Sequence, residues 1–148
     1  MTAIRIDELP DETVALAAAF PVVQQLRPHI EGVEEFIDQV RTQRREGYRL
    51  VVARDPAGSI RALAGFRVMT MLLRGRQLYV DDLVTDAAAR SEGYGSALFA
   101  WLVAEGRRLQ CQELHLDSGV QRFDAHRFYL RQRMAITGHH FALPLESA

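Results

Sequence analysis

The first third of the chain spaces its hydrophobic residues as helices do. Residues 3–6 predict a short strand. An alanine-rich stretch that Asp11 and Glu12 open predicts helix, but Pro21 and Pro28 lie in its path. Proline removes a hydrogen-bond donor and clashes inside a helix. We therefore expect one kinked helix or two short helices that end by Pro28.

A further helix is predicted at residues 31–45. Apolar residues recur there three and four positions apart, which places them on one face of a helix. These residues are Val33, Phe36, Ile37 and Val40. Arg44 and Arg45 fall in the last turn, where positive charge is favourable, and Gly47 follows as a helix stop.

From residue 48 the spacing changes to that of strands. Residues 48–85 contain β-branched and alternating runs that two turns separate. Pro56 and Gly58 belong to the first turn, since proline presets φ and glycine tolerates positive φ. Gly75 lies in the second turn. The pattern predicts a three-stranded antiparallel meander.

The second half of the chain alternates helices and strands. Residues 93–110 predict a helix, residues 113–117 a strand, residues 125–131 a short helix and residues 135–145 a final strand. The strands on either side of the first of these helices should be parallel, with a right-handed crossover. We therefore expect a mixed sheet.

Composition fits one globular domain over residues 1–148. The chain has 148 residues, of which 48% are hydrophobic. No apolar run is long enough to span a membrane, and Asp7 and Glu8 stand where a secretory signal would need apolar residues. We expect a cytoplasmic protein without membrane contact. The single cysteine, Cys111, fits a reducing compartment and is interpreted as a structural thiol.

The charged residues exclude several kinds of chemistry. The formal net charge is −1 and no basic run resembles a nucleic-acid-binding stripe, so nucleic acid is not an expected partner. All 18 basic residues are arginine. The absence of lysine removes Schiff-base chemistry and the phosphate-binding lysine of a P-loop.

Two glycines, Gly93 and Gly95, lie between the third strand of the meander and the helix that follows it. The first turn of a helix leaves backbone N–H groups without partners and carries partial positive charge, so a glycine-rich turn there can bind phosphate. A dinucleotide fingerprint would need a third glycine at position 98, which is Leu98. A tight turn without any ligand is the alternative.

The spacing RxxGxG from Arg90 to Gly95 follows a strand that reads YVDDLVT. It resembles the acyl-CoA pyrophosphate loop of the GNAT superfamily of N-acetyltransferases. Downstream, DAHRFYLRQRM is similar to the family's second motif, AxxFYxxxGF, in which a helix carries a tyrosine beside the coenzyme sulfur. The order of elements also matches the family's fold. The chain departs from the pattern at Arg133, where relatives usually carry glycine, and at Arg122, where asparagine is common.

This resemblance implies an α/β (α+β) fold of the GNAT type, with a mixed, mostly antiparallel central sheet of six to seven strands flanked by about four helices. It implies acetyl-CoA as co-substrate, with the pantetheine arm added like a strand beside the end of the meander. A main-chain N–H of Leu83 or Val84 would polarise the thioester oxygen. The implied cofactor-binding residues are Leu83, Val84, Thr85, Arg90, Ser91, Glu92, Gly93, Tyr94, Gly95 and Ser96.

Acetyl transfer to an amine also needs a base. A protonated alkylamine has a pKa of about 10 and must lose its proton near neutral pH. Strand alternation predicts that Asp81 shares a face with Tyr79 and Leu83, while Asp82 faces the more apolar side. We predict Asp81 as the base, acting directly or by ordering a water, and Asp82 as a buried structural carboxylate.

Tyr129 is the predicted general acid, because a phenol can hand a proton to a departing thiolate. The alternative is an aromatic residue that fills the core beside Phe128. His139 and His140 point to opposite faces of the predicted last strand, so we expect no metal site.

The acceptor is expected to be an amine. Four polar residues lie where this fold usually builds its acceptor pocket, namely Arg27, His29, Glu31 and Glu35. The predicted function is therefore direct, acetyl-CoA-dependent transfer of an acetyl group to a primary amine of a small molecule or peptide. A non-catalytic acyl-CoA-binding or regulatory domain is the alternative, and a protein–protein module would bind no coenzyme. The last strand is where a homodimer is expected to form, if there is one.

Overall fold

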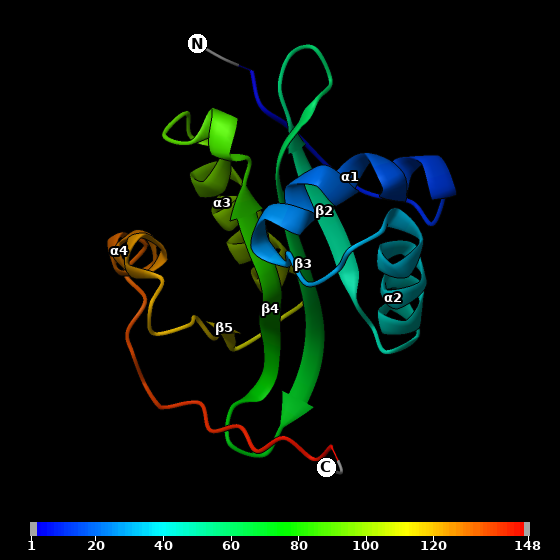
Figure 1. The fold of residues 1–148 in the computed structure, drawn as a ribbon. Coiled ribbons are helices and arrows are strands. Elements are labelled where there is room, and N and C mark those ends of the chain that lie inside the picture. The colour runs from blue at the N-terminus through cyan, green and yellow to red at the C-terminus, as the bar shows by residue number, and fades with distance from the viewer. Residues whose placement is uncertain (1–2, 147–148) are drawn as a thin grey trace. The chain divides into compact units, whose positions relative to one another are not determined.

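The computed structural model describes residues 3–146, and the chain forms two compact units, Met1–His115 and Leu116–Ala148. The elements of the first unit are β1 (Arg5–Glu8), α1 (Thr13–Leu26), α2 (Val33–Arg45), β2 (Arg49–Arg54), β3 (Ile60–Met71), β4 (Gly75–Thr85), a 3-10 turn (Ala87–Ala89), α3 (Tyr94–Arg108) and β5 (Glu113–Leu116), which ends at the boundary (Figure 1). The second unit holds α4 (Phe123–Arg131).

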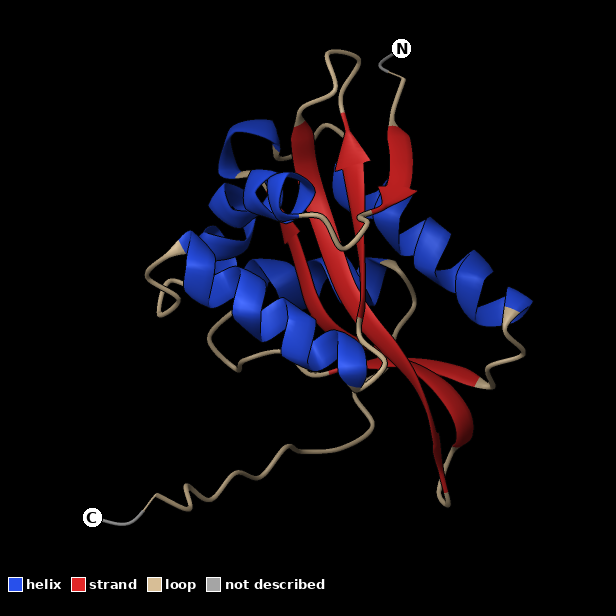
Figure 2. Cartoon of the chain, turned by 90° about the vertical axis from the view of Figure 1, so that its right-hand side faces the viewer, coloured by secondary structure: helices blue, strands red, loops and turns tan. Residues whose placement is uncertain are grey.

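The central sheet has five strands in the order β1-β2-β3-β4-β5. The strands β1 to β4 pair antiparallel with their neighbours in sequence. Helices α1 and α2 cover one face of the sheet, and α3 covers the other (Figures 1 and 2). The prediction of an α+β fold with a mixed, mostly antiparallel sheet is confirmed.

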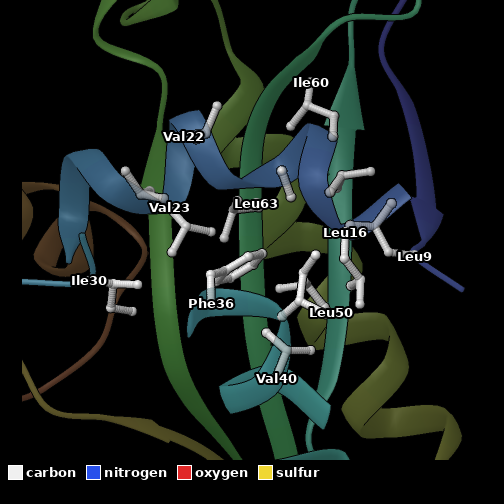
Figure 3. Packing of buried hydrophobic residues seen from close by; sticks show 14 of the residues in the cluster. Leu9, Leu16, Val22, Val23, Ile30, Phe36, Val40, Leu50, Ile60 and Leu63 are labelled. Carbon is white, nitrogen blue, oxygen red and sulfur yellow. The ribbon is translucent and has the colours of Figure 1, made fainter. Parts of the chain in front are cut away.

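A hydrophobic core fills the space between α1, α2 and the sheet (Figure 3). Leu16 of α1 and Phe36 of α2 lie there with Leu50 of β2 and Leu63 of β3, all buried. The helical spacing of apolar residues in α2 is what turns Phe36 toward the sheet. Burying each such side chain stabilises the fold by roughly 1.5–3 kcal/mol.

Most predicted elements are confirmed to within a few residues. The meander, α2, α3, β5 and α4 all form. The strand predicted at residues 3–6 is found two residues later, at Arg5–Glu8. The alanine-rich stretch forms one helix, α1, with Pro21 inside it.

The predicted last strand is wrong. Residues 134–146 contain neither helix nor strand, so the sheet within residues 3–146 has five strands and not six to seven. Alternating apolar residues form a strand only where a neighbouring strand accepts their backbone hydrogen bonds. Residues 135–145 have the alternation of apolar side chains that is typical of a strand. The pattern does not say which other strand they would pair with.

On the α3 face of the sheet, a buried carboxylate holds two arginines. The Glu105 side chain, 7% exposed, accepts hydrogen bonds from Arg108 Nε at 2.5 Å and from Arg49 Nη2 at 2.5 Å. Arg49 also pairs with Glu8 of β1, and its guanidinium lies 4.8 Å from the centre of the Phe66 ring. These bonds, those from Arg108 first, lower the pKa of Glu105 from 4.5 to about 2.

A carboxyl whose pKa is lowered by folding stabilises the fold above its unfolded pKa and loses that contribution as pH falls through its folded pKa. Glu105 should therefore contribute fully above pH 4.5 and lose its contribution between about pH 4.5 and 2. The exposed Arg108 is screened by water, so we expect Glu105→Gln to lower the unfolding free energy at pH 7 by about 2 kcal/mol. Urea denaturation at stepped pH measures this, with Glu34→Gln, an exposed carboxylate of α2, as control. A variant that kept the wild-type pH dependence over that range would contradict the prediction.

Candidate active site

A cavity of about 430 Å³ lies in the first unit. Residues of α1, α2, β3 and β4 and the segments beside them line it. They are Val23, Arg27, His29, Ile30, Phe36, Gln39, Val40, Gln43, Tyr48, Leu63, Tyr79, Asp81 and Asp82. The cavity thus combines an apolar and aromatic wall with two adjacent carboxylates, which is the usual make-up of a small-molecule site.

A β-bulge in β4 brings both carboxylates to this cavity. Gly65 pairs with Asp82 and Phe66 pairs with Val80, so Asp81 is an extra residue on β4. A bulge breaks strict alternation, because two residues on one strand oppose one on its neighbour. The prediction that Asp81 and Asp82 face opposite sides of the sheet is therefore wrong, since both line the cavity.

Asp82 is held from two directions. Arg27 Nε donates to its Oδ1 at 2.9 Å, and the Tyr48 hydroxyl donates to its Oδ2 at 2.7 Å. Burial, and then the charge of Asp82, raises the pKa of Tyr48 well above 10, so this phenol stays protonated and keeps donating. Both carboxylate oxygens of Asp82 are therefore bound by other side chains, and its structural role stays a prediction.

The Asp81 carboxylate is paired with Arg67. Arg67 Nε and Nη2 donate to its two carboxylate oxygens at 3.1 and 2.9 Å. Arg27 Nη2 donates to the Asp81 carbonyl oxygen at 2.9 Å. Burial raises the pKa of Asp81 above 3.8 in spite of Arg67. A carboxylate with a raised pKa in a cavity is a stronger base than an exposed one and is a common feature of functional sites.

Sequence reasoning missed three residues of this cluster, Tyr48, Arg67 and Gly65. A β-carbon at Gly65 would lie 1.7 Å from the Tyr48 hydroxyl oxygen, so only glycine lets the tyrosine reach Asp82. An isolated glycine inside a strand is a known sign of a bulge or of close approach. Gly65 could thus have indicated both the bulge in the sheet and the close approach of Tyr48.

The other predicted acceptor residues divide into two pairs. Arg27 and His29 line the cavity. Glu31 and Glu35 are exposed and do not line it; the Glu31 backbone N–H lies 3.4 Å from the Glu35 carboxylate.

The glycine loop follows the end of β4. Asp86 accepts a hydrogen bond from the Ala88 N–H and so caps the 3-10 turn. Arg90, Ser91, Glu92 and Gly93 are exposed. The chain takes left-handed conformations at Ser91, φ +66°, and at Gly93, φ +92°. It then enters α3, which has no side-chain cap at its start.

The start of α3 therefore lies directly behind an exposed loop. The helix dipole favours an anion at this position. The Tyr94 side chain is buried, so only its backbone is available at the loop. A β-carbon at Gly93 would meet nothing closer than Ile4 at 4.0 Å. The loop therefore has the properties of a phosphate site, with space for a ligand at the main chain.

The end of β4 has one paired edge. Leu83, Val84 and Thr85 pair with Ala64, Leu63 and Ala62 of β3. On the other side, the Gln112 N–H donates to Arg76 at the start of β4, and β5 has four residues against the eleven of β4. The short β5 can therefore cover only the first part of β4.

Tyr129 belongs to the second unit. It lies on α4 and lines a second cavity, of about 310 Å³, together with Leu116, Ser118 and residues of the 134–140 segment. Its ring is 5.6 Å from that of Phe128. Arg133, where relatives usually carry glycine, has φ +67° and so takes the left-handed conformation that glycine adopts most readily.

The other residues considered in the sequence analysis are a cysteine and two histidines. Cys111 is a half-buried free thiol, and His139 and His140 are exposed, with His140 Nδ1 3.6 Å from Asp117. Residues 3–146 hold no group of three or more His, Cys, Asp or Glu side chains that could bind a metal ion. No helix in that range is both long and apolar enough to cross a membrane.

The sequence matches the acetyltransferase (GNAT) family over residues 13–133. The chain belongs to this family. It is 33% identical over 114 residues to the uncharacterized N-acetyltransferase YhdJ of Bacillus subtilis, covering 76% of this chain and 79% of that one. It is 38% identical over 53 residues to an aminoalkylphosphonate N-acetyltransferase of Salmonella typhimurium, covering 36% and 34% of the two chains.

Solved structures show the same fold. A Trypanosoma brucei acetyltransferase superposes with a TM-score of 0.78 at 22% identity, over 97% of this chain and all of that one. A ribosomal-protein-alanine N-acetyltransferase from Brucella melitensis gives 0.82 at 16% identity, over 97% and 100%. The chain is thus a GNAT N-acetyltransferase, and membership of the family implies acetyl-CoA as acetyl donor and an amine as acceptor.

Gly65→Ala should destabilise this GNAT protein, because the added methyl group displaces Tyr48 and breaks its bond to Asp82. We expect a loss of about 2–3 kcal/mol in the free energy of unfolding. Gly106→Ala is the matched control: its β-carbon would lie 3.7 Å or more from Leu78, and alanine favours the helix by up to about 1 kcal/mol. Urea denaturation should therefore give shifts of opposite sign, and equal shifts would contradict the proposed role of Gly65.

Proposed function

We propose that this chain transfers the acetyl group of acetyl-CoA directly to a primary amine of a small molecule or peptide bound in the cavity beside Asp81. The observation that supports this most is the bulge in β4. It points the Asp81 carboxylate, whose pKa is raised, toward a cavity of small-molecule size. The acetyl donor supplies the acetyl group as a reactive thioester.

The donor would be held by main-chain groups. The N–H groups at residues 90–96 would bind the diphosphate, and Arg90 would add positive charge there. Leu83, Val84 and Thr85 would pair with the pantetheine arm along the part of β4 that the short β5 leaves open. A main-chain N–H of Leu83 or Val84 would donate to the carbonyl oxygen as negative charge develops on it.

Asp81 would act as the base and Tyr129 as the acid. Asp81 accepts a proton from the acceptor ammonium, directly or through water, so that the free amine can attack the carbonyl carbon. The carbon–nitrogen bond forms, the carbon–sulfur bond breaks, and the Tyr129 hydroxyl gives its proton to the departing sulfur. No covalent intermediate is needed, so Cys111 has no part in transfer.

The cavity favours an acceptor with an anionic group as well as an amine. The Arg27 side chain is 41% exposed, and its bonds to the Asp82 carboxylate and the Asp81 carbonyl use Nε and Nη2. It can therefore bind a carboxylate, phosphate or phosphonate. The Salmonella relative is described as acting on aminoalkylphosphonates, which combine these two groups.

Gly93→Ala should weaken coenzyme binding about tenfold, because a β-carbon then stands where the diphosphate approaches the main chain. Gly47→Ala is the matched control, since Gly47 has φ +93° against +92° at Gly93 and equally open space around it, at the far end of α2. Both changes cost about 1–2 kcal/mol of backbone strain. Calorimetric titration with CoA should separate them, and equal affinities would argue against the loop as the diphosphate site.

Asp81→Asn and Tyr129→Phe should each lower kcat/KM by about 10²- to 10⁴-fold, because each removes one proton transfer. Neither should change the affinity for CoA. Asp38→Asn, an exposed carboxylate of α2, is the control. The assay follows thiol release and acetylated product over a panel of amines that includes amino acids, aminoalkylphosphonates and polyamines. CoA binding without product from any amine would refute the proposed transfer.

A further inference from the structure

Arg67 of β3 is held on several sides. In the pairing of β3 with β4 it lies opposite Tyr79, two residues before Asp81. Its Nε and Nη2 donate to the two carboxylate oxygens of Asp81 at 3.1 and 2.9 Å. Its guanidinium carbon lies 5.6 Å from the centre of the Tyr48 ring, and its Nη1 lies 4.0 Å from a carboxylate oxygen of Glu46. The arginine is therefore fixed by its strand, by an aromatic ring and by two carboxylates.

The two contacts to one guanidinium group fix the rotation of the Asp81 carboxylate. An ionised carboxylate has about four lone-pair directions, and an arginine that binds both oxygens uses the two on its own side. Burial raises the pKa of Asp81, and the positive charge of Arg67 opposes that rise. Asp81 is thus a base that can accept a proton from a restricted set of directions.

Water can compete with an amine for such a base. The cavity beside Asp81, of about 430 Å³, has room for many water molecules. If Asp81 takes a proton from water, the water oxygen can bond to the acetyl carbon while the carbon–sulfur bond breaks and the sulfur takes up a proton. The products are then acetic acid and the free thiol, and the acetyl group is lost. Active sites commonly restrict water to prevent side reactions of this kind.

We propose that Arg67 is a positioning residue that directs Asp81 toward a bound amine and so suppresses the hydrolysis of acetyl-CoA. The proposal rests on the role of Asp81 as the base under the proposed function. An amine bound in the cavity meets the lone pairs that Arg67 leaves free, whereas water molecules can take many positions around the carboxylate. Without Arg67 the carboxylate rotates and binds a proton more tightly, and both changes favour the activation of water.

Arg67→Gln tests the proposal through the division of acetyl-CoA between two products. We expect acetate formation without any amine to rise about tenfold and the yield of acetylated amine to fall. Arg54→Gln is the matched control. The Arg54 side chain is 19% exposed against 18% for Arg67, and its Nε and Nη2 donate to the two carboxylate oxygens of Asp7 at 3.0 and 3.5 Å. A loss of packing alone would lower both products, so a rise in acetate reports the carboxylate.

The pH profile gives a second measurement. Loss of the Arg67 charge should raise the pKa of Asp81, so the low-pH limb of kcat/KM for amine transfer should move to higher pH. Arg67→Lys keeps the charge but cannot bind both oxygens as a guanidinium does. Its limb should stay near the wild-type position while acetate formation still rises. The other charged or titratable groups that face Asp81 or Arg67 are unchanged in both variants, namely Arg27, His29, Glu46, Tyr48, Tyr79 and Asp82.

The outcomes distinguish this proposal from the proposed function. If the wild type acetylates an amine but Arg67→Gln forms no more acetate than Arg54→Gln, the role of Arg67 is refuted and transfer stands. The same holds for Arg67→Lys if the glutamine variant does not fold.

If the wild type acetylates no amine, transfer is refuted. Acetate that rises in Arg67→Gln and falls again when Asp81→Asn is added would then still support the control of Asp81 by Arg67. A rise that persists when Asp81→Asn is added would overturn it.

Discussion

The cavity depends on holding two adjacent carboxylates, Asp81 and Asp82, on one side of a sheet and partly out of water. Such a pair is costly unless each charge is compensated. Arg67 compensates Asp81 from the neighbouring strand, and Arg27 and Tyr48 hold Asp82 from the end of α1 and the start of β2. The two carboxylates therefore connect α1, β2, β3 and β4, so the same contacts hold the cavity and the core of the first unit together.

The sequence predicted most of this architecture because hydrophobic spacing is a local property. The apolar face of α2, the turns of the meander and the glycine loop before α3 are all encoded within a few neighbouring residues. The bulge at Asp81 is different, because it exists only in the pairing of β4 with Gly65 of β3. Strict alternation therefore put Asp81 and Asp82 on opposite faces, although it did identify Asp81 as the residue to test.

The prediction of a last strand was wrong for a related reason. Residues 135–145 have a strand pattern, but a strand is a relation between two segments, and the pattern contains only one of them. The same physical fact accounts for the exposure of Phe141, Leu143 and Leu145.

Arginine is used at this site for its shape as well as its charge. Arg27 reaches the Asp82 carboxylate and the Asp81 carbonyl with two different nitrogens, and Arg67 binds both oxygens of Asp81 with two of its nitrogens. A lysine could supply the charge but not the several fixed N–H donors of a guanidinium group. The lack of lysine in this chain is therefore compatible with a site of this kind. If Asp81 is the base, as we propose, it can accept a proton only on the lone pairs that Arg67 leaves free. The guanidinium plane then restricts the direction from which an amine can approach, so Arg67 would contribute to acceptor selection without touching the acceptor.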